Sequence, residues 1–208
     1  DEETPADTGV NFEVGQIGKI PVIYGDEEDT STIGKIVEEN VNISKQEWDD
    51  YEYSWDFKRH PLISVISKKD KIFDRDNIYI YECYQLWENE CSNRFNLLKK
   101  NEEDLNRIFI DIYDLKGEIS PEVENEEITV RLADKRRDIK SLLSYAVGCM
   151  LGRYSLDVEG LVYTHGEWNE SNYLTFIADK DNIIPISDDE YFEDDIVNRF
   201  IRFIEVVY

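Results

Sequence analysis

The spacing of the apolar residues constrains this fold more than any other feature of the sequence. Between residues 134 and 152, apolar side chains recur at the three- and four-residue intervals of one helical face. Asp134 before this run and Gly152 after it are residue types typical of helix caps. The stripe predicted to face the core is Ile139, Leu142, Leu143, Ala146, Val147, Met150 and Leu151. We therefore expect a buried-face helix from Asp134 to Leu151.

Five further segments favour helix, which makes the predicted fold class mainly α. These segments are 31–41, 44–51, 77–98, 101–117 and 187–207. Ser44 with Glu47, and Ser187 with Glu190, have capping-box spacing, and Asn101 is a residue type that favours a helix start. Together they predict an irregular helical domain of about six helices.

The segments between these helices predict little regular structure. Residues 1–10 are acidic and turn-rich, and we expect partial disorder there. Residues 11–24 contain two glycines and a proline, which predicts a short extended N-terminal segment, followed by a loop at 25–30. Residues 62–66 read as a short buried element, and 128–132 as a strand. At most one small strand pair is expected.

The charge limits what the chain binds by itself. Lys and Arg number 23 against 47 acidic residues, a formal net charge of −24. Affinity for nucleic acid that does not depend on sequence comes from cations on phosphates, so DNA should be repelled by the chain as a whole. A contact with DNA therefore requires a local basic patch or another part of a larger protein.

Two basic groups stand out in this acidic chain. One is Lys58 with Arg59, and the other is Lys135, Arg136 and Arg137 with Lys140 and Arg153. Cations in the first turn of a helix oppose its dipole, so helix stability does not explain the second group. The alternatives are an ordinary solvated face, salt bridges to nearby acidic loops, or a contact with DNA phosphate or with an acidic surface of a larger enzyme.

Other chemically suggestive patterns favour structural interpretations. The carboxylates at 188–190 and 193–195 suit a helix start, and the aromatic residues of 48–57 alternate with acids, which favours packing over base stacking. Gly148 and Gly152 suit close helix packing and a C-cap, and Cys149 suits a core thiol.

Three cysteines and two distant histidines form no zinc pattern, and no apolar run reaches membrane-spanning length. We predict no catalytic, cofactor-binding or metal-binding residues.

Several stretches resemble one family in the same order and at similar spacing. They are NFEVGQIGKIPVI (11–23), SKQEWDDYEYSWDFKRHPL (44–62), NEEDLNRIFIDIYDL (101–115), RDIKSLLSYAVGCMLGRYSLDVEGLVY (137–163) and DNIIPISDDEYFEDDIVNRFI (181–201). These segments resemble the C-terminal region of adenine-specific DNA methyltransferases of the PglX type, from BREX phage-defence systems. Restriction enzymes that fuse cleavage, methylation and specificity share weaker versions of these patterns.

The resemblance implies a part of an S-adenosylmethionine-dependent enzyme that methylates the N6 of adenine, with the base flipped out of the duplex. The family's Asn-Pro-Pro-Tyr signature is absent, since the sequence contains no Pro-Pro, and no glycine-rich cofactor loop is found. Residues 1–30 would end the target-recognition region, and 31–208 would form a helical C-terminal domain. The implied function is a non-catalytic module of a cytoplasmic enzyme that braces target recognition or partner contacts.

The resemblance also implies partners and cofactor. The partners would be the rest of the methyltransferase chain, DNA through the full-length enzyme, and other defence-system proteins, with no membrane. S-adenosylmethionine would bind elsewhere in the full-length enzyme. The alternative that composition leaves open is a free-standing acidic interaction protein or DNA mimic, which a net charge of −24 would suit.

Overall fold

The computed structural model describes residues 18–68, 78–189 and 191–208. Over these residues the chain forms five α-helices and no strand, so the mainly α prediction is confirmed. The helices are α2 (Glu27–Asp49), α3 (Pro61–Lys68), α4 (Ile80–Ile112), α5 (Lys135–Met150) and α6 (Ile196–Val207). Two short 3₁₀ turns, Asn125–Glu127 and Glu170–Asn172, interrupt the connecting segments. The predictions for residues 1–17 lie outside the described residues.

Helix α2 corrects two predictions. It runs unbroken through Ser44, so the expected break there is wrong, and it begins within the segment expected to be a loop. Asp26 is the N-cap, because its carboxylate accepts a hydrogen bond from the Asp29 amide at 2.8 Å. The acidic first turn that follows suits the positive end of the helix dipole. The same residues that suggested a loop thus begin the helix.

Helix α4 corrects the predicted start of a helix at Asn101. This residue lies within one continuous helix of 33 residues, about 50 Å long at 1.5 Å per residue. Its side-chain amide donates to Glu39 Oε2 at 2.7 Å and to Asn40 Oδ1 at 2.9 Å, both on α2. Asn101 therefore joins two helices and caps neither.

Two further predictions are corrected by contacts. The predicted strand at 128–132 is irregular chain, with Ile128 and Val130 buried against other elements. Helix α6 starts at Ile196, not at Ser187: Asp195 is the N-cap, and its carboxylate accepts from the amide of Val197 at 2.7 Å. The Ser187 hydroxyl donates to the same carboxylate at 2.9 Å. Glu190, the other half of the predicted capping box, lies outside the described residues.

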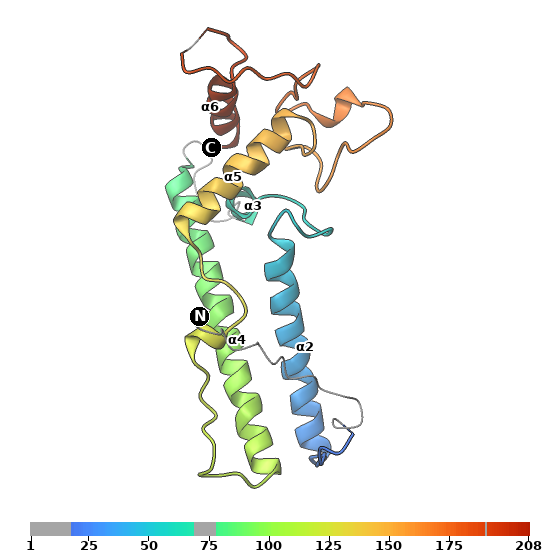
Figure 1. The fold of residues 1–208 in the computed structure, drawn as a ribbon, viewed down its shortest axis with the longest axis vertical. Coiled ribbons are helices and arrows are strands. Elements are labelled where there is room, and N and C mark those ends of the chain that lie inside the picture. The colour runs from blue at the N-terminus through green and yellow to red at the C-terminus, as the bar shows by residue number, and fades with distance from the viewer. Residues whose placement is uncertain (1–17, 69–77, 190) are drawn as a thin grey trace, which may run out of the picture.

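The helices form an elongated molecule with two parts (Figure 1). We call residues 25–49 and 95–134 the stalk, in which α2 and the second half of α4 run antiparallel and the 113–134 segment returns along α4. The head is formed by the described residues of 50–94 and 135–208, where α3, α5 and α6 gather around the first half of α4. Helix α4 is thus common to both parts.

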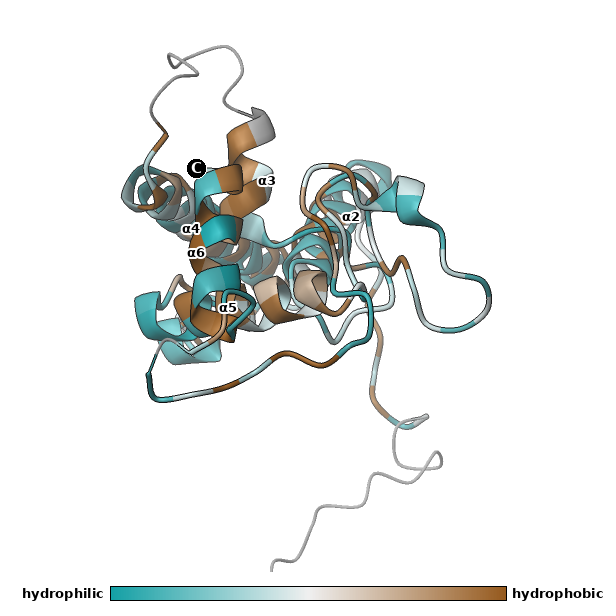
Figure 2. Ribbon diagram, turned by 90° about the horizontal axis from the view of Figure 1, so that it is seen from above, coloured by the Kyte–Doolittle hydropathy of each residue, from teal (hydrophilic) through white to brown (hydrophobic). Residues whose placement is uncertain are grey.

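Each part has its own hydrophobic core. In Figure 2 the hydrophobic colour is concentrated in α3 and α6, at the head. The head core contains Phe57, Leu62, Ile63, Trp87, Cys91, Leu142, Tyr145, Ala146, Cys149, Met150, Tyr154, Phe176 and Phe203. The stalk core is smaller and contains Ile43, Phe95, Leu98, Val123, Ile128 and Val130. The stalk therefore depends more on polar contacts between its helices.

The predicted caps of α5 are confirmed, but its predicted buried stripe is partly wrong. Asp134 accepts from the Arg137 amide at 2.6 Å, and Gly152 has a φ of +75°. Leu143 and Leu151 are 41% and 37% exposed, whereas Tyr145 is fully buried. The face of α5 that packs into the head core is rotated from the predicted stripe toward Tyr145. Aromatic rings from other segments pack against this side chain. No helix of the described residues has the length and apolar character needed to cross a membrane.

Candidate interaction surface

The basic residues at the start of α5 differ in their surroundings. Arg137 is half-buried, and its guanidinium donates from Nε to Asp138 Oδ1 at 2.8 Å and from Nη2 to the carbonyl of Leu132 at 2.9 Å. Asp138 is itself buried and also accepts from the Trp87 indole at 3.1 Å. Arg137 is thus part of the link between α5 and α4.

Lys135, Arg136 and Lys140 are exposed. None of the three forms an ion pair with a residue that the structure describes. Arg136 and Lys140 are one turn apart and share a face of the helix. Lys135 and Arg136 also oppose the helix dipole in the first turn, and no described residue pairs with any of the three cations, so they are available to negative charge from outside.

Arg131 belongs to the same region and was missed by sequence reasoning. Its guanidinium lies 3.9 Å from the centre of the Tyr51 ring, and its Nε donates to Glu47 Oε1 at 2.5 Å. A second nitrogen donates to the hydroxyl of Tyr53. Burial raises the pKa of Tyr51 to about 12, so its hydroxyl stays neutral. Glu47 is 84 positions away from Arg131 in sequence, so no local sequence pattern predicts this contact.

The remaining predicted site residues contact other segments. Lys58 lies 3.8 Å from Glu159 in an exposed ion pair, and Arg59 donates to the carbonyl of Leu156 at 3.0 Å. The Nε of Arg59 is buried with no hydrogen-bond partner among the described residues. Arg153 is exposed, with its guanidinium 5.4 Å from the ring centre of Tyr154. Lys58 and Arg59 therefore meet the 156–160 loop, away from the first turn of α5.

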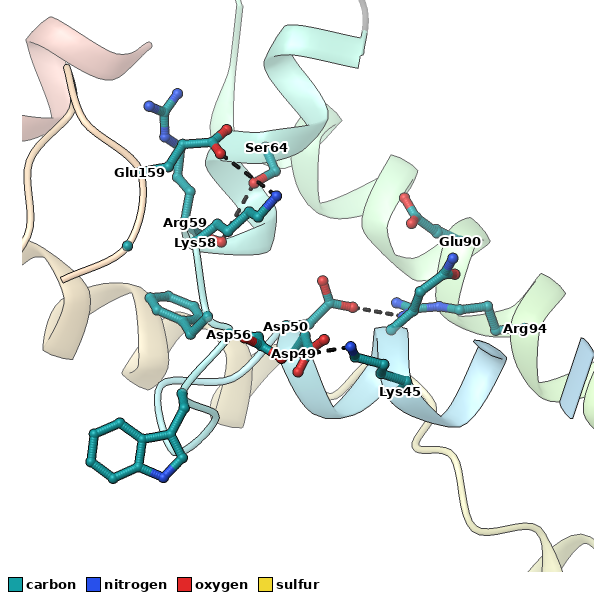
Figure 3. Close-up of a pocket in the computed structure, with 14 residues that line it drawn as sticks. Lys45, Asp49, Asp50, Asp56, Lys58, Arg59, Ser64, Glu90, Arg94 and Glu159 are labelled. Carbon is teal, nitrogen blue, oxygen red and sulfur yellow. Dashed lines mark hydrogen bonds and ion pairs between the residues drawn. The ribbon is translucent and has the colours of Figure 1, made fainter. Parts of the chain in front are cut away.

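A groove opens between the end of α2, the segment 50–60 and α4 (Figure 3). Its volume is about 820 Å³. Charged residues line it: Lys45, Asp49, Asp50, Asp56, Lys58, Arg59, Glu90, Arg94 and Glu159. Arg94 donates to Asp50 at 2.6 Å, and Lys45 lies 3.6 Å from Asp56. The uncharged rim includes Trp55 and Phe57. The groove is thus bounded by paired charges and by aromatic rings.

Burial holds two cysteines of the head core and the nearby His60 in their neutral forms. Burial raises the pKa of the Cys91 and Cys149 thiols to about 12, and it lowers the pKa of His60 to about 3. Among the described residues no three His, Cys, Asp or Glu side chains gather as metal ligands would. The exposed side chains described above are cations, carboxylates and aromatic rings, which are groups suited to binding a partner molecule.

Comparison with known proteins gives two relatives. No family model matches the chain. It is 38% identical over 201 residues to the adenine-specific methyltransferase PglX of Lacticaseibacillus casei (strain Zhang). It is 33% identical over 226 aligned residues to the adenine-specific methyltransferase BrxX of Escherichia coli O9:H4 (strain HS). The chain spans 16% and 17% of the length of these relatives. Over 96% of its own length, the chain is therefore homologous to one region of the PglX- and BrxX-type adenine-specific methyltransferases.

Proposed function

We propose that the chain is the non-catalytic, helical C-terminal module of a BREX-type, S-adenosylmethionine-dependent adenine-N6 DNA methyltransferase, and that it braces the target-recognition region. The observation that carries this proposal is the single continuous helix α4, which joins the head core to the stalk core. The module begins with α2 at Glu27, a few residues before the expected boundary at residue 31, and the residues before α2 end the preceding target-recognition region. Cofactor binding and catalysis belong to the rest of the polypeptide.

Polar contacts make the stalk suitable as a brace. Asn101 on α4 is bonded to α2 within the stalk, and Arg94 is paired with Asp50 where the stalk meets the head. Arg131 ties the return segment to Glu47 of α2. Half-buried, directional contacts of this kind fix the register of the elements that they join. A rigid stalk keeps whatever binds its two ends at a constant separation, which precise placement of DNA over a flipped base requires.

The exposed cations of α5 give the module a second role. Lys135, Arg136 and Lys140 approach DNA phosphate or an acidic surface of the intact enzyme, with Lys58, Arg59 and Arg153 as weaker contributors. Each phosphate contact contributes about 0.9 to the slope of log affinity against log salt concentration. The salt slope of DNA affinity therefore reports how many of these cations contact phosphate.

The test uses the full-length polypeptide that contains this chain. In it, Lys135→Glu, Arg136→Glu and Lys140→Glu are combined, and DNA binding and adenine methylation are measured. The expected result is a loss of DNA affinity of about 10-fold or more at 150 mM salt, with a smaller salt slope. The control combines Lys35→Glu, Lys100→Glu and Lys180→Glu, three exposed lysines elsewhere with the same change of net charge. Equal losses in both variants would contradict a specific contact by α5.

A further inference from the structure

Three aromatic side chains, one in the last turn of α2 and two in the segment that follows it, are substantially exposed to solvent. Trp55 is 94% exposed, Trp48 56% and Tyr53 49%. The rings of Trp48 and Tyr53 are 4.4 Å apart, and Tyr53 and Trp55 line one small cavity of about 190 Å³. Trp55 also lines the large groove described above. We call Trp48, Tyr53 and Trp55 the aromatic rim.

The neighbouring ring already binds a cation. Tyr51 stacks on Tyr53 at 5.6 Å, and its face holds the guanidinium of Arg131, whose charge is paired with Glu47. The guanidinium of Arg137 lies 5.7 Å from the same ring. An aromatic face with an adjacent carboxylate is favourable for arginine, since the ring attracts the planar cation and the carboxylate pairs with it. No described cation lies over the ring of Trp48 or Trp55.

Carboxylates stand beside these open rings. Asp49 accepts from the Ser54 hydroxyl at 2.7 Å and contacts no described cation. Asp56, next to Trp55, lies 3.6 Å from the exposed Lys45, its one ion-pair partner among the described residues, and such exposed pairs are weak and easily exchanged. Phosphate would be repelled by these groups, whereas a guanidinium would find both a ring and an anion. Trp48 and Trp55, with Asp49 and Asp56 beside them in the chain, thus offer the same pair of groups, a ring and a carboxylate, that Tyr51 and Glu47 offer to Arg131. The third ring of the rim, Tyr53, lies 5.6 Å from the Arg131 guanidinium.

We propose that the aromatic rim and the adjoining groove dock an arginine-bearing segment from elsewhere in the same methyltransferase polypeptide. This inference rests on the proposed function. The relatives are about six times as long as the chain, because it spans 16% and 17% of them. An enzyme that binds DNA places cations on phosphate, and this part of it has a net charge of −24. Apart from the exposed cations of α5, most of the cationic surface that such an enzyme needs therefore lies in the remaining part, which can supply the complementary charge.

The test is site-specific photo-crosslinking in the full-length polypeptide. The photoreactive residue p-benzoylphenylalanine replaces Trp55, and crosslinked peptides are identified by mass spectrometry. Tyr81, an exposed ring on α4 that lines no part of the groove, is the control position. The expected result is an intramolecular crosslink from position 55 to an arginine-bearing segment, absent from position 81. Adding Asp49→Asn, which retains an acceptor for Ser54, should lower the yield several-fold at 150 mM NaCl.

Four outcomes would overturn the inference: no crosslink, a crosslink to DNA, a crosslink to another protein, or one to a segment without arginine. A third probe at Arg136 separates this inference from the proposed function. If position 136 crosslinks to DNA or to the rest of the polypeptide but position 55 does not, docking at the aromatic rim is contradicted. The proposed function of the module is then unaffected. Methylation by the α5 variants remains an independent test of the module's role.

Discussion

At the scale of single residues, Gly148 permits the closest packing in the head. A Cβ at this position would come 2.5 Å from Cδ2 of Tyr154. The Tyr154 ring is buried and stacks on Tyr145 with centroids 5.1 Å apart, so a shift away from an added Cβ would disturb this stacking. The residue is glycine because a neighbouring ring occupies the volume of its missing side chain.

Gly148→Ala is therefore expected to destabilise the chain by about 1–3 kcal/mol, as overpacked core substitutions do. The matched control is Gly34→Ala in α2, where a Cβ meets nothing within 4 Å. There the better helix propensity of alanine should stabilise by roughly 0.5–1 kcal/mol. Urea unfolding of both variants measures the two effects. A Gly148→Ala variant as stable as the original would show that Tyr154 yields.

His60 predicts a pH dependence of stability. Burial lowers its pKa from 6.5 to about 3, and its Nδ1 accepts from the amide of Leu62 at 3.3 Å, which requires the neutral ring. Between pH 6.5 and 3 the unfolded chain binds one more proton at this site than the folded chain. Stability is therefore full above pH 6.5 and falls with pH below it, by up to about 1.4 kcal/mol per pH unit.

The measurement compares the original chain with His60→Gln, which keeps an acceptor but does not titrate. From pH 7 to pH 5 the original should lose roughly 2 kcal/mol more than the variant in its free energy of unfolding. Staying above pH 5 limits interference from carboxylates. Parallel pH profiles for the two proteins would mean that His60 is protonated in the folded state.

At the scale of elements, Asn101 decides how α2 and α4 meet. It is buried, and its amide donates to two acceptors on α2. Asn101→Ala should cost about 1–2 kcal/mol, because both hydrogen bonds are lost and the acceptors Glu39 and Asn40 must find water. The control, Asn96→Ala, removes an exposed asparagine from the same helix and should be neutral within about 0.5 kcal/mol. Chemical denaturation distinguishes them, and equal effects would contradict the pinning role.

At the scale of the whole molecule, the net charge of −24 opposes compactness. Raising NaCl from 10 to 150 mM shortens the screening length from about 30 to about 8 Å, so repulsion between distant carboxylates weakens. We expect the melting temperature to rise by about 2–4 °C, which corresponds to about 1 kcal/mol. A variant with Glu118→Gln, Glu122→Gln and Glu126→Gln, all exposed, should respond less. A melting temperature that falls with salt would show that favourable ion pairs outweigh the repulsion.

The two cores divide the whole molecule into two parts, the head and the stalk. The head has a large aromatic core, and the stalk has a small one supported by polar contacts between α2, α4 and the return segment. Helix α4 continues through both parts, so the two cores share one helix. This arrangement agrees with homology to one region of much longer methyltransferases.

The sequence by itself determined the helical class, the caps of α5 at Asp134 and Gly152, and the short buried element that became α3. These features depend on residues within one or two turns, so local spacing specifies them. It also marked the basic run of α5, without separating Arg137 from its three exposed neighbours.

Only the tertiary structure decided the rest. Asparagine favours a helix start when its side chain has no partner other than the local backbone. The side chain of Asn101 instead bonds two acceptors on α2, so α4 continues through this position. Arg131 is held near Arg137 of α5 by its contacts with Glu47 and Tyr51, which are far from it in sequence. Leu143 is partly exposed and Tyr145 buried because rings from other segments set the rotation of α5. In each case a partner distant in sequence outweighed the local preference, since it satisfied a polar group or filled a volume that neighbours along the chain left open.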